Sequence, residues 1–200
     1  MKASELLLTA SSEVGYCGKK SNAMLDDPTA NQLGLWTKYA RDLAEAGYYN
    51  GNKNGFNYCT VFADWCFWKT ADGNKEIAQA TKPYCILNAG VYWAYKAFKD
   101  VNRTGDSPKE GACIFFQDSS KELCHIGIVE YVNDNTVNTI EGNVGKKVVR
   151  KSYNLNDSKI YGYGYPFYEE EPEPQPVDDW ETVASWTGTD GKELRLQKHK

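Results

Sequence analysis

The sequence predicts an α+β domain, in which N-terminal helices pack on a C-terminal antiparallel β-sheet. Apolar residues recur at helical spacing as far as about residue 103. Short β-type runs separated by Gly, Asn and Asp follow that point. Helices first and strands second are typical of this fold class. At 200 residues, the chain is long enough for one domain with a sizeable core and a short appendage.

Four helices are expected in the first half of the chain. Residues 3–16 and 34–46 have helical patterns that end near a glycine, which is a stop signal. A third helix begins near Cys59, after an Asn- and Gly-rich loop, and a fourth covers about 86–98. The third helix has one apolar stripe, formed by Val61, Phe62, Trp65 and Cys66.

The second half of the chain predicts a sheet, a linker and a tail. The β-type runs are 113–116, 126–132, 136–141, 148–150 and 160–165. We therefore expect one folded domain over 1–168. Residues 169–179 are acidic and proline-rich, which predicts an extended linker. Residues 180–200 resemble the opening hairpin of a further small β module, or a short docking tail.

Composition excludes several classes of protein. The net charge is −4, and the acidity lies in the tail, where residues 169–200 hold 9 Asp and Glu against 4 Lys and Arg. No basic patch predicts a nucleic-acid partner. No apolar run approaches the roughly 20 residues that span a bilayer. The first residues lack the longer apolar core of a secretory signal, so we expect synthesis in a cytosol and reduced cysteines.

Metal sites are weakly indicated. Cys113, Cys124 and His125 could share a metal, but their spacing fits no zinc pattern. Asn50, Asn52 and Asn54 alternate before Cys59, which hints at a calcium loop. Calcium prefers negatively charged oxygens, and no carboxylate lies among these asparagines. We therefore expect no cofactor, with calcium kept as an alternative.

The candidate nucleophile is Cys59, at the first turn of the third helix. The N–H groups and the positive dipole end of a helix N-terminus favour a thiolate. His125 opens a β-type run and is one of only two histidines; the other, His199, lies in the tail. An imidazole within reach of the thiol would make the activated pair of a cysteine hydrolase. Cys17, Cys66, Cys85, Cys113 and Cys124 are interpreted as structural.

A hairpin would bring His125 to its acidic companions. If Asn133 to Asn135 form a three-residue turn, Gly127 faces Glu141 and His125 faces Asn143, all on one side of the sheet. Glu141 or Asn143 would then hold the ring tautomer, which is the third role of a catalytic triad. The glycine would leave space above the sheet. The Cys59 N–H could donate to an oxyanion.

These residues resemble CHAP domains, the cysteine, histidine-dependent amidohydrolases/peptidases. Residues 58–66, YCTVFADWC, resemble the family's nucleophile helix, and 108–116 resemble its Pro-x-x-Gly-Asp strand. Residues 125–129 and 139–143 are similar to its histidine and acidic strands. The openings 12–16 and 38–43 look like those of phage and prophage endolysins. Tyr58 replaces the family's usual Trp and Ala112 its Asp, and neither change removes a catalytic group.

The resemblance covers about residues 1–168 and implies a papain-like core that hydrolyses amide bonds of bacterial peptidoglycan. It implies Cys59 as nucleophile, His125 as general base and then acid, Glu141 as the group that orients the ring, and Asn143 as its assistant. It also implies an endolysin that is made in the host cytoplasm and reaches the wall after release. The tail would then resemble the join to a wall-binding module. We expect a monomer.

Three questions stay open at this stage. The chain could be a non-catalytic wall-binding module with a degenerate site, or a toxin-like wall hydrolase. Either an N-acetylmuramoyl-L-alanine amidase or a peptide endopeptidase could use the same triad. Five aromatic residues could line the substrate groove or belong to the core. They are Tyr48, Tyr49, Phe56, Tyr92 and Trp93.

Overall fold

The computed structural model describes residues 1–27, 29, 33–169, 180–187 and 193–199. It divides into two compact units, Met1–Glu169 and Glu170–Lys200. The first unit contains helices and an antiparallel sheet, so the predicted α+β class is confirmed. The helices are α1 (Ala3–Ser12), the 3-10 turn η1 (Asn22–Met24), α2 (Lys38–Glu45), α3 (Cys59–Thr70), α4 (Lys75–Thr81) and α5 (Val91–Asp100).

The sheet of the first unit has six antiparallel strands in the order β1-β6-β2-β3-β4-β5. The strands are β1 (Thr104–Gly105), β2 (Cys113–Gln117), β3 (Leu123–Asn133), β4 (Thr136–Val144), β5 (Lys147–Asn154) and β6 (Ile160–Gly164). The last of them returns to lie beside β2. This placement leaves β3 and β4 as inner strands, with neighbours on both sides.

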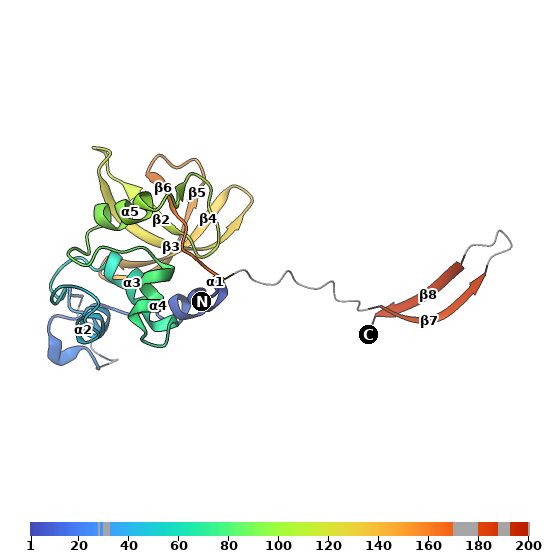
Figure 1. Cartoon of the computed structure of the whole chain (residues 1–200), viewed down its shortest axis with the longest axis horizontal. Coiled ribbons are helices and arrows are strands. Elements are labelled where there is room, and N and C mark those ends of the chain that lie inside the picture. Colours follow the sequence, from blue (N-terminus) through green and yellow to red (C-terminus); the bar gives the residue numbers. More distant parts are fainter. Residues whose placement is uncertain (28, 30–32, 170–179, 188–192, 200) are drawn as a thin grey trace. The chain divides into compact units, whose positions relative to one another are not determined.

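Helix α3 lies at the centre of the helical layer. It packs on α1, α2 and α4 and on strands β3 and β4 (Figure 1). Every residue from Cys59 to Phe67 is buried. The four residues of the predicted stripe lie within this buried stretch, and the burial extends around the whole circumference because other elements surround the helix. This packing holds Cys59 at a fixed place beside the sheet.

The other helices differ from the predictions mainly at their ends. The first ends at Ser12 and not 16, and the left-handed Gly15 follows at φ +97°. The second begins only at Lys38, because the Thr37 side chain accepts from the N–H of Ala40 and caps the helix there. Helix α4 was not predicted. Its signal was Asn74, which caps the N–H of Ile77.

The sheet separates two groups of buried side chains. Along β2, Cys113 and Phe115 pack with the helices, whereas Ile114 and Phe116 belong to a smaller cluster with Val129. This alternation follows from the twofold period of a strand. Fully burying one such large apolar side chain stabilises the fold by about 1.5–3 kcal/mol. The sheet that carries the histidine is thus held from both faces.

The second unit contains a hairpin of β7 (Trp180–Thr187) and β8 (Glu193–His199). The expected linker falls largely on residues 170–179, which lie outside the described residues. The role of residues 180–200 as part of a wall-binding module stays a prediction.

Two further properties bear on the environment of the chain. All six cysteines lie in the described part of the chain, and each is a free thiol. Among the described residues, no helix has the length and apolar character that crossing a membrane requires.

Candidate active site

Cys59 is the first residue of α3 and is 5% exposed. The preceding residue, Tyr58, provides no side-chain cap. The first N–H groups of a helix have no partner within the helix. Since no side chain caps them here, they remain available at the thiol. A thiolate and a developing oxyanion are both stabilised by such N–H groups and by the helix dipole.

His125 on β3 and Glu141 on β4 form a direct pair. The ring Nε2 lies 2.9 Å from Oε2 of Glu141, and the Glu141 side chain is 1% exposed against 22% for the ring. Two more hydroxyls donate to this carboxylate. The Oγ1 of Thr139 lies 2.6 Å from Oε1, and the hydroxyl of Tyr153 lies 3.3 Å from Oε2. Three donors therefore fix the carboxylate that orients the ring.

Gly127 makes room for this carboxylate. A Cβ atom on Gly127 would lie 2.7 Å from Cγ of Glu141, which is closer than real Cβ contacts come. The sequence predicts that this glycine leaves space above the sheet and faces Glu141. The structure places the two side by side, so this part of the geometry is confirmed.

The His125 ring interacts with three side chains. Besides Glu141, the Cys59 side chain lies close enough to the ring to act on its pKa. Because Glu141 holds Nε2, Nδ1 is the nitrogen that remains for the thiol. Phe116 of β2 pairs with His125 across the strands, and its ring centroid lies 5.7 Å from the imidazole centroid.

The same contacts determine the charge of the ring. Burial by itself lowers the pKa of an imidazole. The hydrogen bonds to Cys59 and Glu141 outweigh burial and raise the pKa of His125 from 6.5 to about 9. The ring is therefore protonated at neutral pH. A charged imidazole beside a thiol is the arrangement of the activated pair in cysteine hydrolases.

The hairpin of β3 and β4 contains a different turn from the one predicted. Asn133 pairs with Thr136, so the turn contains only two residues, and Asp134 adopts φ 46°. The expectation of a three-residue turn is therefore wrong. An irregularity between Val129 and Tyr131 then shifts the ladder by one residue, and Ile128 pairs with Ile140. This is the predicted register at the site, because a bulge adds one residue to one strand.

Asn143 lies at the end of β4, where the pairing with β5 is irregular, and has a left-handed backbone at φ 66°. Its side-chain Nδ2 donates to Oδ1 of Asn57 at 3.0 Å. This bond ties the strand end to the loop before Cys59. The contact was not expected from the sequence, and the assistance of Asn143 to the ring stays a prediction.

Gly142 sets the distance between α3 and the sheet. A Cβ atom on Gly142 would lie 2.5 Å from Cβ of Phe62. Only a residue without a side chain allows the helix to approach β4 this closely. Since Phe62 lies one turn after Cys59, this contact places the thiol within reach of His125.

The remaining candidate residues fall into separate groups. Tyr48 and Tyr49 are 0% and 5% exposed and belong to the core, whereas Phe56, Tyr92 and Trp93 are exposed. Cys17, Cys66 and Cys113 are buried, and Cys124 is exposed. Burial raises the pKa of Cys113 to about 12 and that of Cys66 well above its usual value. These two buried thiols stay protonated and unreactive.

The asparagine loop before Cys59 is held by its own hydrogen bonds. Oδ1 of Asn52 accepts from the Asn54 N–H at 2.7 Å, and Oδ1 of Asn54 accepts from the Thr37 N–H at 2.8 Å. The first is the ordinary turn interaction of asparagine, and the second ties the loop to the residue that caps α2. Within the described residues, no three His, Cys, Asp or Glu side chains gather closely enough to hold a metal. The donor set of this loop does not fit calcium.

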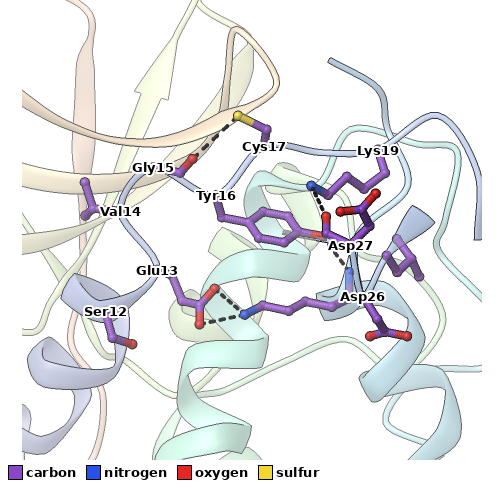
Figure 2. Close-up of a pocket in the computed structure, with 11 residues that line it drawn as sticks. Ser12, Glu13, Val14, Gly15, Tyr16, Cys17, Lys19, Asp26 and Asp27 are labelled. Atoms are coloured by element: carbon purple, nitrogen blue, oxygen red, sulfur yellow. Dashed lines mark hydrogen bonds and ion pairs between the residues drawn. The ribbon is translucent and has the colours of Figure 1, made fainter. Parts of the chain in front are cut away.

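Figure 2 shows a separate cavity of about 560 Å³, which is lined by residues 12–17, including the stretch that resembles endolysin openings. Several of its charged groups already have partners. Lys38 lies 2.8 Å from Glu13, and the Tyr39 hydroxyl donates to the same carboxylate. The Lys19 ammonium donates to the carbonyl of Asp27. None of Cys59, His125 and Glu141 lines this cavity, so it does not serve their chemistry.

A thiol at a helix N-terminus, beside an imidazole that hydrogen-bonds to a buried carboxylate, is typical of cysteine hydrolases. Comparison with protein families agrees with this class. The family model of the CHAP domain matches residues 47–143, which is just under half of the chain and includes Cys59, His125 and Glu141. The resemblance seen in the motifs is thereby confirmed for this stretch. No curated protein matches the chain.

Two solved structures are similar to the chain at low sequence identity. The first is described as "The crystal structure of Ly7917", with 12% identity, a TM-score of 0.49, and coverage of 83% of this chain and 63% of that one. The second is described as "The crystal structure of Ly7917 with the hydrolyzing product of MDP", with 14% identity, a TM-score of 0.45, and coverage of 82% and 63%. The chain thus spans less than two thirds of the length of these structures.

Proposed function

We propose that this protein is a peptidoglycan hydrolase that cleaves an amide bond of the bacterial cell wall by a thiol mechanism. One observation carries the proposal. The same imidazole ring lies next to the thiol at the start of α3 and hydrogen-bonds to a buried carboxylate on β4. Cys59 and His125 are the catalytic residues, and Glu141 is a positioning residue that acts through the ring.

In the first half of the reaction, the Cys59 thiolate attacks the carbonyl carbon of the scissile amide. The oxyanion that forms accepts hydrogen bonds from the N–H groups at the start of α3. The His125 imidazolium donates its proton to the leaving nitrogen as the C–N bond breaks. The products are a free amine and an acyl group bonded to the Cys59 sulfur, and His125 is left neutral.

In the second half, water releases the acyl group. Neutral His125 accepts a proton from the attacking water, and the C–S bond breaks as the carboxylic product forms. Cys59 leaves as a thiolate beside the imidazolium, which restores the starting pair. Glu141 favours the charged ring throughout the cycle, because its carboxylate stabilises the positive charge on Nε2.

The wall substrate is supported by the match to the CHAP domain, and the bond cleaved is a separate question. Amidase and endopeptidase activity need the same nucleophile and base. Mass spectrometry of digested muropeptides separates them. A free amino group on L-Ala indicates an amidase, whereas cleaved stem or cross-bridge peptides indicate an endopeptidase.

Cys59→Ala tests the assigned nucleophile. Clearing of purified cell walls should fall by on the order of 10⁴-fold or more, because no other group can form the acyl-enzyme. Circular dichroism should show an unchanged fold, since only one sulfur is removed. The matched control is Cys85→Ala, which removes a partly exposed thiol outside the site and should keep activity. Retained clearing by Cys59→Ala would refute the mechanism.

The biological setting extends this proposal. We propose an endolysin that is made in the host cytoplasm, acts on the wall after release as a monomer, and uses residues 180–200 as the start of a wall-binding module. The resemblance of residues 12–16 and 38–43 to endolysin openings supports this setting. Loss of binding to purified walls after deletion of residues 170–200, with cleavage of soluble muropeptides retained, would support the role of the tail.

A further inference from the structure

A hollow of about 380 Å³ adjoins the start of α3. Two of its lining residues flank the thiol in the sequence, Asn57 before it and Val61 after it. Asn57 is also the partner of Asn143 at the end of β4. A molecule in this hollow therefore lies next to residues that flank Cys59 in the sequence.

The walls of the hollow combine exposed apolar side chains with amides. Phe56 and Leu87 line it and are 67% and 69% exposed. Large apolar side chains gathered in a hollow are typical of ligand grooves. Asn57 and Asn88 add amide groups that can hydrogen-bond to a peptide backbone. This lining favours a peptide segment with an apolar side chain.

Among the described residues, Lys53 is the only charged one that lines the hollow, and none of the lining residues is acidic. Its ammonium lies 3.4 Å from the carbonyl oxygen of Asn50 and 5.5 Å from the centroid of the Tyr49 ring. Within the described part of the chain, Lys53 forms no salt bridge. A carboxylate in the hollow would give this cation the partner that the protein does not supply.

We propose that this hollow is a subsite for a peptide that carries an apolar side chain and a free carboxylate, and that Lys53 pairs with the carboxylate. This inference rests on the proposed function and names the part of the substrate that the site recognises. The subsite lies on one side of the scissile amide. Its pairing with Lys53 aligns the peptide with the thiol, so a substrate whose carboxylate is amidated binds less tightly.

The test measures binding without cleavage. Isothermal titration on the Cys59→Ala protein compares a soluble muropeptide with free carboxylates and the same muropeptide after chemical amidation. Replacing Lys53 by Met should weaken binding of the free form by about 2- to 5-fold, the effect of a solvent-exposed ion pair. Lys53→Glu should weaken it further. The matched control, Lys159→Met, removes an exposed lysine outside the hollow and should change neither affinity.

Amidated muropeptide should bind equally to the Cys59→Ala protein and to its Lys53→Met form. Equal losses for the free and amidated forms, or unchanged binding by Lys53→Glu, overturn the subsite. Failure of the proposed function gives a different result, because the protein with Cys59 intact then leaves both muropeptides uncleaved. Carboxylate-dependent binding through Lys53 would still be measurable in that case.

Discussion

Two buried carboxylates, Asp64 on α3 and Glu141 on β4, have different partners and different access to solvent. Asp64 lies 2.6 Å from the Lys82 ammonium, with side-chain exposures of 2% and 0%, and the Tyr49 hydroxyl donates to its other oxygen. Glu141 is 1% exposed, but its partner, His125, is 22% exposed. One ion pair is sealed in the core and the other opens to the surface.

This difference indicates a structural role for the Asp64 pair and a chemical role for the Glu141 pair. Burial by itself lowers the pKa of Lys82, but attraction to Asp64 outweighs burial and raises it. His125 has a pKa near 9 and contacts both a thiol and solvent, so it can gain and lose a proton during a reaction. We expect changes at the sealed pair to alter stability, and changes at the open pair to alter rate.

The largest expected effect on stability comes from substitution of Lys82 in the sealed pair. Lys82→Met leaves the Asp64 carboxylate buried without a cation, which should lower the free energy of unfolding by about 3–5 kcal/mol. Urea unfolding followed by circular dichroism measures this change. The double variant Lys82→Met/Asp64→Leu removes both charges and should recover most of the loss. A single variant as stable as the double variant would contradict the assignment of a structural ion pair.

Two glycine substitutions should have effects of intermediate size, one on stability and the other on the rate of the reaction. Gly142→Ala places a methyl group 2.5 Å from Cβ of Phe62, which should cost about 1–3 kcal/mol of stability through overpacking. Gly127→Ala instead displaces the Glu141 side chain and should lower kcat by about 10- to 100-fold. Thermal unfolding and wall-clearing rates measure both variants. An unchanged rate in Gly127→Ala, with normal stability, would show that the position of Glu141 is unimportant.

The smallest expected effect is a shift in pH dependence. The pKa of His125 is raised to about 9 in the folded protein from 6.5, so the charged ring contributes stability below pH 6.5 that is lost as pH rises through about 9. Activity should fall over the same alkaline range, because the imidazolium is lost. In Glu141→Gln the ring loses one of the interactions that raise its pKa, so the alkaline fall in activity should move to lower pH. A profile of kcat/KM against pH that does not move would count against the pairing.

Much of the fold was predictable because periodic patterns act between residues close in sequence. The helix that begins at Cys59 and the strands that carry His125 and Glu141 were all expected, since helical and twofold periods are local properties. Helix α4 and the short strand β1 were missed. Each is short, and short elements depend on contacts with the rest of the fold more than on their own pattern.

The supporting contacts of the site were harder to foresee. Tyr153 reaches Glu141 from β5, and Asn57 reaches Asn143 from the loop before α3. Neither pair shares a local pattern. The register at Glu141 agreed with prediction, although the turn did not, because the irregularity at Val129 to Tyr131 offsets a turn that is one residue shorter.

The order of residues along the chain was enough to identify a thiol at a helix start, an imidazole at a strand start and a carboxylate on the next strand. Those identities follow from residue type and local backbone preference. Which ring nitrogen faces which partner, how deeply each ion pair is buried, and which lysine borders the hollow beside Cys59 were decided by packing. Burial and hydrogen bonding between distant segments set those properties, and they exist only when α3 lies against the sheet.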